Sequence, residues 1–282
     1  MIQTIIKNIM NTLTDKEKQI GKYILNFPKE TSSYTSEELA KKVGVSQSSI
    51  IKFIKKLGYK GFIKFKIELN KEIALNNSDE KLYTEITVKD SLKEIGDKIL
   101  YENVSSLTDT ISAINYEVLE KVIDLLDSSR KILIIGSGMS SIVSKDLELK
   151  LIKLGKIAYH PENTQMQLMH LSTMEKGDTL IAISHTGETK EIIEVVTHAK
   201  NRALKIITLT TFSKNTLSLL GEYNLFTISR ESMLRTAAIS SRMAQMILID
   251  LIFLGLMQRN FNEVKNYIET SREIVGWKNK KI

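Results

Sequence analysis

The sequence contains no cysteine and no long apolar run. Without cysteine the chain forms no disulfide and carries out no thiolate chemistry, which fits a reducing cytoplasm. No stretch approaches the roughly 18 uninterrupted apolar residues of a membrane span, and Lys7, Asn8 and Asn11 interrupt the N-terminal apolar residues, so neither a membrane segment nor a signal peptide is expected. Internal repeats and low-complexity tracts are also lacking. What remains is a globular, cytoplasmic protein, and 282 residues favour two domains.

The excess positive charge is confined to the first quarter of the chain. Residues 1–77 hold 14 Lys and 7 acidic residues, a net charge of +7, whereas residues 78–282 hold 26 basic and 26 acidic residues and are neutral. This asymmetry indicates a basic module, for which nucleic acid is the commonest partner. On charge alone, a solvated lysine-rich helical surface remains the alternative.

Helix signals within the basic module predict three successive short helices. The first begins with the capping box Thr14–Glu17 and ends near Pro28. The second begins with the capping box Thr35–Glu38 and ends at Gly44, and the third runs from Ser46 to Gly58. Because the last two are joined by a short turn that contains glycine, the pattern predicts a helix-turn-helix.

The third helix combines an apolar stripe with a polar face. In a recognition helix the first polar residues reach base edges and later lysines meet phosphates, which is the order of residues here. The alternative is an ordinary three-helix bundle with a solvated lysine face. The residues expected to contact DNA are Ser46, Gln47, Ser48, Ser49, Lys52, Lys55 and Lys56.

The stretch TSEELAKKVGVSQSSIIKFIKKLGYKGFIKFKIEL resembles the N-terminal domain of the RpiR family of bacterial transcription regulators. The resemblance covers about residues 1–77 and implies an all-α DNA-binding domain there. The family commonly has arginine before the phenylalanine of the recognition helix, whereas this chain has Lys52. Lysine favours phosphate contact over bidentate recognition of guanine.

The remainder of the chain is expected to be a helical linker, a second domain and a tail. Residues 78–121 form the linker, which begins with a polar, weakly periodic stretch. Residues 122–262 form the second domain, and residues 263–282 the C-terminal tail.

From Arg130 onward, apolar strand patterns alternate with helical ones. This alternation predicts a doubly wound, parallel, five-stranded sheet flanked by helices, in which ligands bind at the carboxyl ends of the strands. The expected strands are Lys131–Ile135, Lys156–Tyr159, Thr179–Ile183, Lys205–Leu209 and Leu225–Ile228. The expected helices include Ser141–Leu154, Lys190–Asn201 and a long closing helix at Leu234–Gln258.

Two of these strands run into short stretches of glycine and hydroxyl residues. They are GSGMSS, residues 136–141, and SHTGET, residues 184–189, called here the first loop and the second loop. Glycine allows close backbone approach, and hydroxyls with helix N-terminal amides donate to a dianion, so a phosphate cradle is predicted.

A dinucleotide site, a Walker A loop and a purely structural role are the alternatives to a phosphate cradle in the two loops. A dinucleotide site is disfavoured because Ser141 replaces the third glycine of the fingerprint and the second strand ends without an acidic residue. A Walker A loop is excluded, since no G-K-[ST] occurs. A purely structural use of the hydroxyls as helix N-caps stays open.

The stretches IIGSGMSSIVSKDLELKLIKLG and ISHTGETKEII resemble the sugar isomerase (SIS) domain, whose phosphosugar loop is typically S-x-S-G-x-T. The match spans about residues 120–260, and MLRTAAISSRMAQMILIDLIF resembles the segment that ends the domain in RpiR-type regulators. Thr186 stands where serine is usual, and its methyl group would narrow the pocket. The phosphosugar-binding residues that the resemblance implies are Gly138, Ser140, Ser184, Thr186, Gly187 and Thr189.

SIS domains occur both in phosphosugar enzymes and in regulators that only bind phosphosugars. An isomerase needs a general base near the sugar C1 or C2. The candidates His160, His170, His185 and Glu188 have no clear catalytic setting, and the acids and histidines lack zinc-type spacing. We therefore expect no catalytic residue, no metal and no cofactor.

The sequence thus predicts a cytoplasmic regulator of carbohydrate genes that binds operator double-stranded DNA and a sugar phosphate effector. A homodimer or homotetramer is expected, since a helix-turn-helix dimer reads two half-sites. Arg235 and Arg242 lie near the closing helix. We expect them to form structural ion pairs; the alternative is that they reach a phosphate ligand from a neighbouring subunit. The alternatives are a phosphosugar isomerase or lyase with a basic helical appendage, and a phosphosugar-binding protein whose basic module contacts protein.

Overall fold

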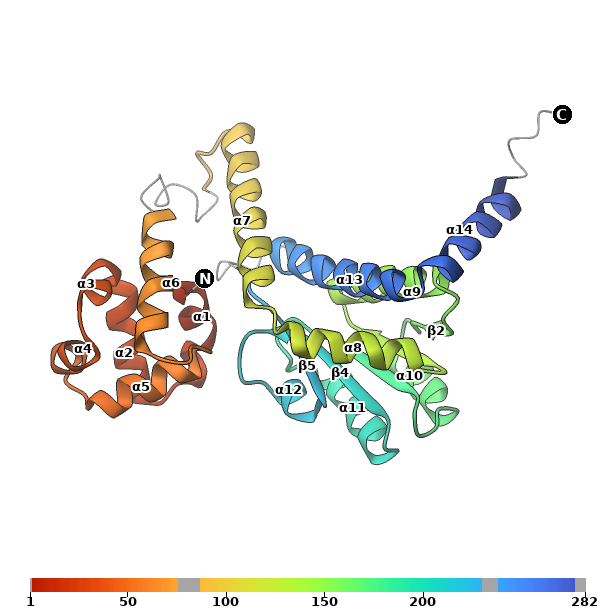
Figure 1. Cartoon of the computed structure of the whole chain (residues 1–282), viewed down its shortest axis with the longest axis horizontal. Coiled ribbons are helices and arrows are strands. Elements are labelled where there is room, and N and C mark those ends of the chain that lie inside the picture. Colours follow the sequence, from red (N-terminus) through yellow and green to blue (C-terminus); the bar gives the residue numbers. More distant parts are fainter. Residues whose placement is uncertain (1, 76–86, 230–237, 277–282) are drawn as a thin grey trace.

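The computed structural model describes residues 2–75, 87–229 and 238–276. They form a helical N-terminal domain and an α/β C-terminal domain that lie side by side along the long axis of the molecule (Figure 1). The N-terminal elements are α1 (Ile2–Ile9), η1 (Met10–Thr12), α2 (Asp15–Asn26), α3 (Pro28–Ser33), α4 (Ser36–Val43), α5 (Gln47–Lys56) and α6 (Phe62–Leu75).

The predicted caps of the N-terminal domain are confirmed. The Thr14 and Thr35 side chains accept from the backbone of Glu17 and Glu38, whose carboxylates bond back to the caps. Gly44 ends α4 with a φ of 78°, a conformation that glycine adopts at little cost. The predicted stripe of α5 forms the centre of the core, fully or almost fully buried: Ile50, Phe53, Ile54 and Leu57.

The C-terminal domain is the predicted parallel sheet, with strand order β2-β1-β3-β4-β5. Its strands are β1 (Ile132–Gly136), β2 (Ala158–Tyr159), β3 (Thr179–Ile183), β4 (Lys205–Thr211) and β5 (Tyr223–Thr227). Its helices are α7 (Leu92–Ala113), α8 (Tyr116–Ser128), α9 (Met139–Lys153), α10 (Thr164–Ser172), α11 (Lys190–Asn201), α12 (Thr216–Leu220), α13 (Ile239–Arg259) and α14 (Phe261–Val275). The expected closing helix is α13, and residues 234–237 of that expectation lie outside the described residues.

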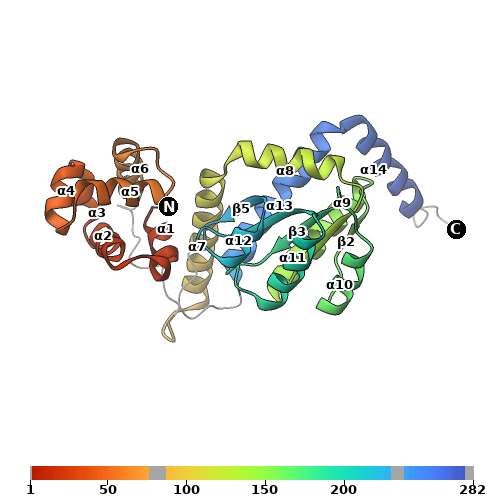
Figure 2. The ribbon, with the colours of Figure 1, turned by 90° about the horizontal axis from the view of Figure 1, so that it is seen from below.

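Helices cover both faces of the sheet (Figure 2). Alternate strand residues point to opposite faces, so Ile134 and Ile181 pack with α8, α9 and α13, whereas Ile135 and Leu180 pack with α10, α11 and α12. The strands are buried on both sides, which explains why they read as continuous apolar runs.

Helix α13 is long and apolar enough to cross a membrane by length and composition alone. In the fold it is a core helix. Its buried residues Leu248, Ile249, Ile252 and Leu256 belong to the apolar cluster on one face of the sheet. The apolar character of α13 is therefore accounted for by packing within the domain.

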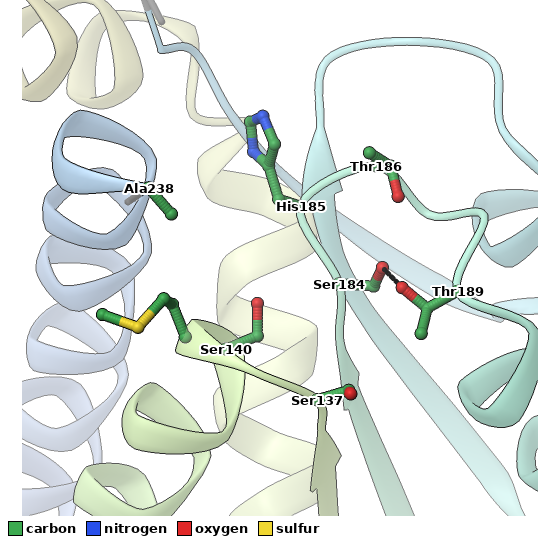
Figure 3. A pocket seen from close by; sticks show the side chains of 8 residues that line it. Ser137, Ser140, Ser184, His185, Thr186, Thr189 and Ala238 are labelled. Carbon is green, nitrogen blue, oxygen red and sulfur yellow. Dashed lines mark hydrogen bonds between the residues drawn. The ribbon is translucent and has the colours of Figure 1, made fainter. Parts of the chain in front are cut away.

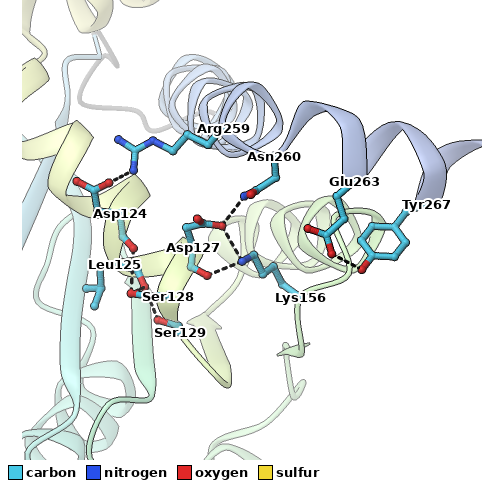
Figure 4. A network of polar contacts seen from close by, with 10 residues as sticks. All are labelled: Asp124, Leu125, Asp127, Ser128, Ser129, Lys156, Arg259, Asn260, Glu263 and Tyr267. Atoms are coloured by element: carbon cyan, nitrogen blue, oxygen red, sulfur yellow. Dashed lines mark hydrogen bonds and ion pairs between the residues drawn. The ribbon is translucent and has the colours of Figure 1, made fainter.

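A polar network fixes the junction of α13 and α14 to the end of α8 (Figure 4). Asp127 Oδ1 accepts from Lys156 Nζ at 2.8 Å and from Asn260 Nδ2 at 2.6 Å, and Arg259 pairs with Asp124. The stretch expected as a C-terminal tail is helical as far as Val275.

The two domains meet at the carboxyl end of the sheet. Ile228, which follows β5, is fully buried and belongs to the same apolar cluster as the core of the N-terminal domain. Phe212 and Ala113 pack against that cluster. The Thr110 hydroxyl of α7 donates to the Ile228 carbonyl at 3.1 Å and accepts from its amide at 3.0 Å. The end of β5 is thus anchored on α7 while it contacts the N-terminal domain.

Two leucines of α9 test the assignment of its buried face. Leu147 is fully buried and Leu149 is 50% exposed. We expect Leu147→Ala to lower the free energy of unfolding by about 2–5 kcal/mol, because it leaves a cavity. Leu149→Ala should lower it by clearly less, because the half-exposed side chain leaves no cavity inside the domain. Denaturant unfolding of both variants measures this, and equal losses at the two positions would contradict the packing.

Candidate functional site

The first and second loops lie side by side because β1 and β3 are neighbouring parallel strands. Ile135 pairs with Ala182 and Gly136 with Ile183, so the chain leaves both strands at the same level. Between the loops is a cavity of about 270 Å³ (Figure 3). The described residues that line it are Ser137, Met139, Ser140, Ser184, His185, Thr186, Thr189 and Ala238.

In the first loop, glycine is required by close packing at Gly136. A Cβ there would lie 2.4 Å from Ser144 Oγ and 2.7 Å from the Ser140 carbonyl oxygen. Gly138, with a φ of 58°, is the residue that precedes α9. The hydroxyl of Ser140 lies in the cavity lining and within 3.4 Å of Gln245 Oε1 on α13. The first loop is thereby held against both α9 and α13.

In the second loop, the three predicted hydroxyl residues line the cavity, and the Ser184 and Thr189 hydroxyls point toward each other (Figure 3). Ser184 Oγ lies 2.9 Å from Thr189 Oγ1 and accepts from the Gly187 amide at 3.2 Å. Thr186 Oγ1 accepts from the Glu188 amide at 3.3 Å. Hydroxyl groups from three residues therefore converge on one side of a glycine turn.

The reading of these hydroxyls as helix caps does not describe the loops. Thr189 is the N-cap residue of α11, yet its side chain makes no capping hydrogen bond and contacts Ser184 instead. Gly138 is the N-cap of α9 and has no side chain to cap it. Two helix N-termini without side-chain caps therefore begin at this cavity, and their partial positive charge suits an anion.

Three of the candidate catalytic side chains have structural partners. His160 is buried, with Nδ1 3.0 Å from the Ile134 carbonyl oxygen and Nε2 2.9 Å from Ser141 Oγ. The His170 ring stacks on Tyr159 at a centroid distance of 4.9 Å.

The third, Glu188, lies just before α11, and its carboxylate accepts from the amide and hydroxyl of Thr216 at the start of α12. His185 is the titratable residue among the described residues that line the cavity. Arg235 lies outside the described residues, and Arg242 lies on α13, partly buried.

Helix α5 presents most of the residues expected to contact DNA. The Ser46 side chain caps it by accepting from the Ser49 amide at 3.2 Å, and Gln47 Nε2 donates to Ser36 Oγ at 2.8 Å. Ser48, Lys52 and Lys55 are exposed. The exposed face thus begins with amide and hydroxyl groups and continues with ammonium groups.

Lys56 has a different environment from the other lysines of α5. Its Nζ lies 2.8 Å from Glu17 Oε2, and this ion pair joins α5 to α2. Burial raises the pKa of Glu17, but the hydrogen bonds from Lys56 and Thr14 outweigh it and leave the pKa below its ordinary value of 4.5. Lys56 therefore has a structural partner that the sequence pattern does not reveal.

Sequence reasoning missed three residues of the cavity lining: Ser137, Met139 and Ala238. Ser137 and Met139 lie in the first loop that the pattern singled out. Ala238 precedes α13, and its φ of 52° is unusual for a residue other than glycine. No local sequence signal places Ala238 beside loops that lie far earlier in the chain.

The fold and the two sites define a class of protein. A helix-turn-helix domain with a basic second helix, joined to a parallel sheet with a hydroxyl-lined cavity, is a DNA-binding regulator that responds to a sugar phosphate. Two family models match these parts: the helix-turn-helix domain of the rpiR family over residues 1–76, and the SIS domain over residues 125–255.

Whole-chain comparison gives the family. The chain is 32% identical over 275 residues to an uncharacterised HTH-type transcriptional regulator of Caldanaerobacter subterraneus subsp. tengcongensis, covering 98% of this chain and 97% of the relative. The protein belongs to the RpiR family of transcriptional regulators, as its two motifs suggested.

Solved structures share the fold. The NanR protein of Vibrio vulnificus complexed with ManNAc-6P is 26% identical, with a TM-score of 0.61 and coverage of 98% of both chains. The sugar isomerase domain of an RpiR transcription factor from Sphaerobacter thermophilus is 14% identical, with a TM-score of 0.59. It covers 64% of this chain and 99% of that one, and at this identity it shows the fold alone.

Gly187 tests the second loop. Its φ is 68°, and a Cβ would lie 2.1 Å from Asn215 Oδ1. We expect Gly187→Ala to abolish measurable sugar phosphate binding, because the loop must move away from Asn215. Gly177 has a φ of 99° with open space around its Cβ position, so Gly177→Ala should cost about 1–2 kcal/mol of stability and leave binding intact. Calorimetric titration compares the two, and binding by Gly187→Ala at the wild-type level would contradict the loop geometry.

Lys55 and Lys56 form a matched pair on α5. Lys55→Ala should reduce the slope of DNA affinity against salt by about 1, as expected for a lost phosphate contact. Lys56→Ala should instead lower the stability of the N-terminal domain by up to about 1 kcal/mol. Because the folded-state pKa of Glu17 is lowered, that stabilisation is present above pH 4.5 and lost as the pH falls through the folded-state pKa. DNA titration at several salt concentrations measures the phosphate contact, and thermal unfolding at two pH values measures the ion pair. A loss of stability in Lys55→Ala, with a reduced salt slope in Lys56→Ala, would contradict the ion pair of Lys56.

Proposed function

We propose that this regulator binds a sugar phosphate between the first and second loops and thereby changes its affinity for operator double-stranded DNA. The observation that carries the proposal is the convergence of hydroxyls and two uncapped helix N-termini on one cavity. Ser184, Thr186 and Thr189 hold the phosphate, and Ser140 contacts phosphate or sugar. Gly138 and Gly187 let the backbone approach the ligand.

The DNA-binding surface that we propose is the exposed face of α5. Ser46, Gln47, Ser48 and Ser49 stand at the helix start, where base edges are reached, and Lys52 and Lys55 meet phosphates. Lys56 contributes to the positive potential while it holds α5 on α2.

The first ligand to test is ManNAc-6P, which the Vibrio vulnificus NanR structure contains. Its phosphate fits the proposed chemistry of the second loop, and its sugar would face Ser140 and Met139 across the cavity. The methyl group of Thr186 would narrow the pocket relative to serine, so a panel of pentose, hexose and amino-sugar phosphates is tested beside ManNAc-6P.

We propose that the ligand is sensed and is not converted. An isomerase needs a base beside the sugar. The carboxylate of Glu188 is engaged by Thr216, and both ring nitrogens of His160 lie at hydrogen-bonding distance from Ser141 and Ile134. These partners favour a structural role for both side chains.

We further propose that the regulator works in the cytoplasm as a homodimer or homotetramer. A helix-turn-helix dimer reads two half-sites about one turn of DNA apart. Ile142, Leu149 and Ile152 of α9 are each about half exposed, and such apolar surface is what a second copy would cover.

Ser184 tests the phosphate site. Ser184→Ala should weaken binding of the sugar phosphate by about 1–3 kcal/mol, because its hydroxyl contacts a charged group. A thermal-shift screen of sugar phosphates on the wild type, beginning with ManNAc-6P, identifies the ligand, since a tight ligand raises the melting temperature. The same ligand must also change the affinity for DNA upstream of the protein's own gene.

Three results would contradict the proposal. Turnover of a sugar phosphate without salt-sensitive DNA binding would indicate an enzyme with a basic appendage. Unchanged ligand affinity in Ser184→Ala would place the phosphate elsewhere. Binding of sugar phosphate without any binding of duplex DNA at low salt would assign the basic domain to protein contacts.

A further inference from the structure

The second loop contacts the start of α12 through Gly187 and Glu188, which are not among the described residues that line the cavity. Glu188 Oε1 accepts from the Thr216 amide at 2.8 Å, and Oε2 accepts from the Thr216 hydroxyl at 2.7 Å. The Gly187 carbonyl accepts from the Leu217 amide at 3.0 Å. Two consecutive residues of the loop therefore satisfy the first two amides of α12.

Asn215 completes this junction. Its side chain is almost fully buried, with Oδ1 accepting from the Ser218 amide at 2.8 Å and Nδ2 donating to Thr210 Oγ1 of β4 at 3.1 Å. It occupies the space beside Gly187 where any larger residue would place its Cβ. The loop, the start of α12 and the end of β4 are thus one hydrogen-bonded unit.

The charge of Glu188 needs an explanation in a loop proposed to hold a dianion. A carboxylate turned toward the ligand would repel it at this short range. Here both carboxylate oxygens accept hydrogen bonds from Thr216, and Glu188 is not among the described residues that line the cavity. Hydrogen bonds to a charged acceptor are stronger than neutral ones, so the same charge that would oppose binding can hold the loop in shape.

We infer that Glu188 is a positioning residue for the phosphate site, and that it acts through Thr216 by clamping the second loop onto α12. This inference rests on the proposed function. The contact between Glu188 and Thr216 holds the loop hydroxyls toward the cavity before the ligand arrives, so that ligand binding does not have to order them.

The two possible roles of Glu188, positioning the loop or only contributing negative charge, predict opposite changes in ligand affinity when the carboxylate is removed. If Glu188 only contributes negative charge, Glu188→Ala tightens the binding of a dianion. If it positions the loop, Glu188→Ala weakens binding, and we expect about a tenfold higher Kd, as for the loss of charge-assisted hydrogen bonds. Glu188→Gln keeps the reach and one acceptor for the Thr216 amide, so its Kd should fall between those of the wild type and Glu188→Ala.

Two further variants control the experiment. Thr216→Val removes the hydroxyl donor from the far side of the clamp and should weaken binding in the same direction as Glu188→Ala. Glu191 is exposed in the first turn of α11, so Glu191→Ala removes an equal charge nearby and should change the Kd by less than about twofold.

The probe for the binding measurement is ManNAc-6P with inorganic phosphate beside it, titrated calorimetrically into the full-length chain. Hydrogen exchange without ligand supplies a second readout. The amides of Thr216 and Leu217 should exchange faster in Glu188→Ala than in the wild type, while the core strands β1 and β3 remain protected.

Each outcome decides something. Tighter or unchanged binding by Glu188→Ala, or unchanged exchange at Thr216 and Leu217, overturns the positioning role. If the wild type binds neither probe but exchange at α12 still rises in Glu188→Ala, the clamp stands and the proposed ligand class fails. The inference is supported if Glu188→Ala binds more weakly and exchanges faster at Thr216 and Leu217, while Glu191→Ala keeps the wild-type Kd within about twofold.

Discussion

The parallel pairing of β1 with β3 is the constraint on which the rest of the structure depends. Gly136 lies opposite Ile183, so both loops leave the sheet at one level, and the reversal of strand order between β2-β1 and β3-β4-β5 opens a crevice there. Such strands need apolar cover on both faces, which α9 and α13 provide on one side and α10, α11 and α12 on the other. The cavity is therefore a consequence of the topology, and its chemistry is set by the few residues that follow the two strands.

The two sites that we propose would handle two kinds of phosphate by different physical means. In the cavity, the described lining residues offer hydroxyls and helix N-termini, which act at short range and depend on direction. On α5, exposed lysines such as Lys52 and Lys55 provide charge on flexible stems, which suits a polyanion whose counterions are released on binding. Directional neutral donors favour one small ligand, whereas mobile ammonium groups tolerate many positions along a DNA backbone.

The strands along the chain and the two loops were predictable because their signals are local, whereas the order of the strands within the sheet was not predicted. A buried apolar run that stops at glycine and hydroxyl residues marks a strand end, and the capping boxes at Thr14 and Thr35 mark helix starts. The partners of Lys56 and Glu188 were not predictable in the same way. Glu17 and Thr216 lie far from them in sequence, and only the packing of α5 on α2 and of α12 beside the second loop brings the groups together.

Sensing, as proposed above, needs both a ligand site and a means of transmitting its occupancy. Of the candidate bases, His160 and Glu188 are engaged in hydrogen bonds, whereas His185 lines the cavity. A preordered ligand site improves the affinity for the effector. Affinity alone does not change DNA binding, because an effector shifts a conformational equilibrium only when it binds the two conformations with different affinities. Ile228 lies at the same end of the sheet as the cavity and belongs to the apolar core of the N-terminal domain, so the domain that carries α5 is packed against the end of the sheet where the proposed site lies.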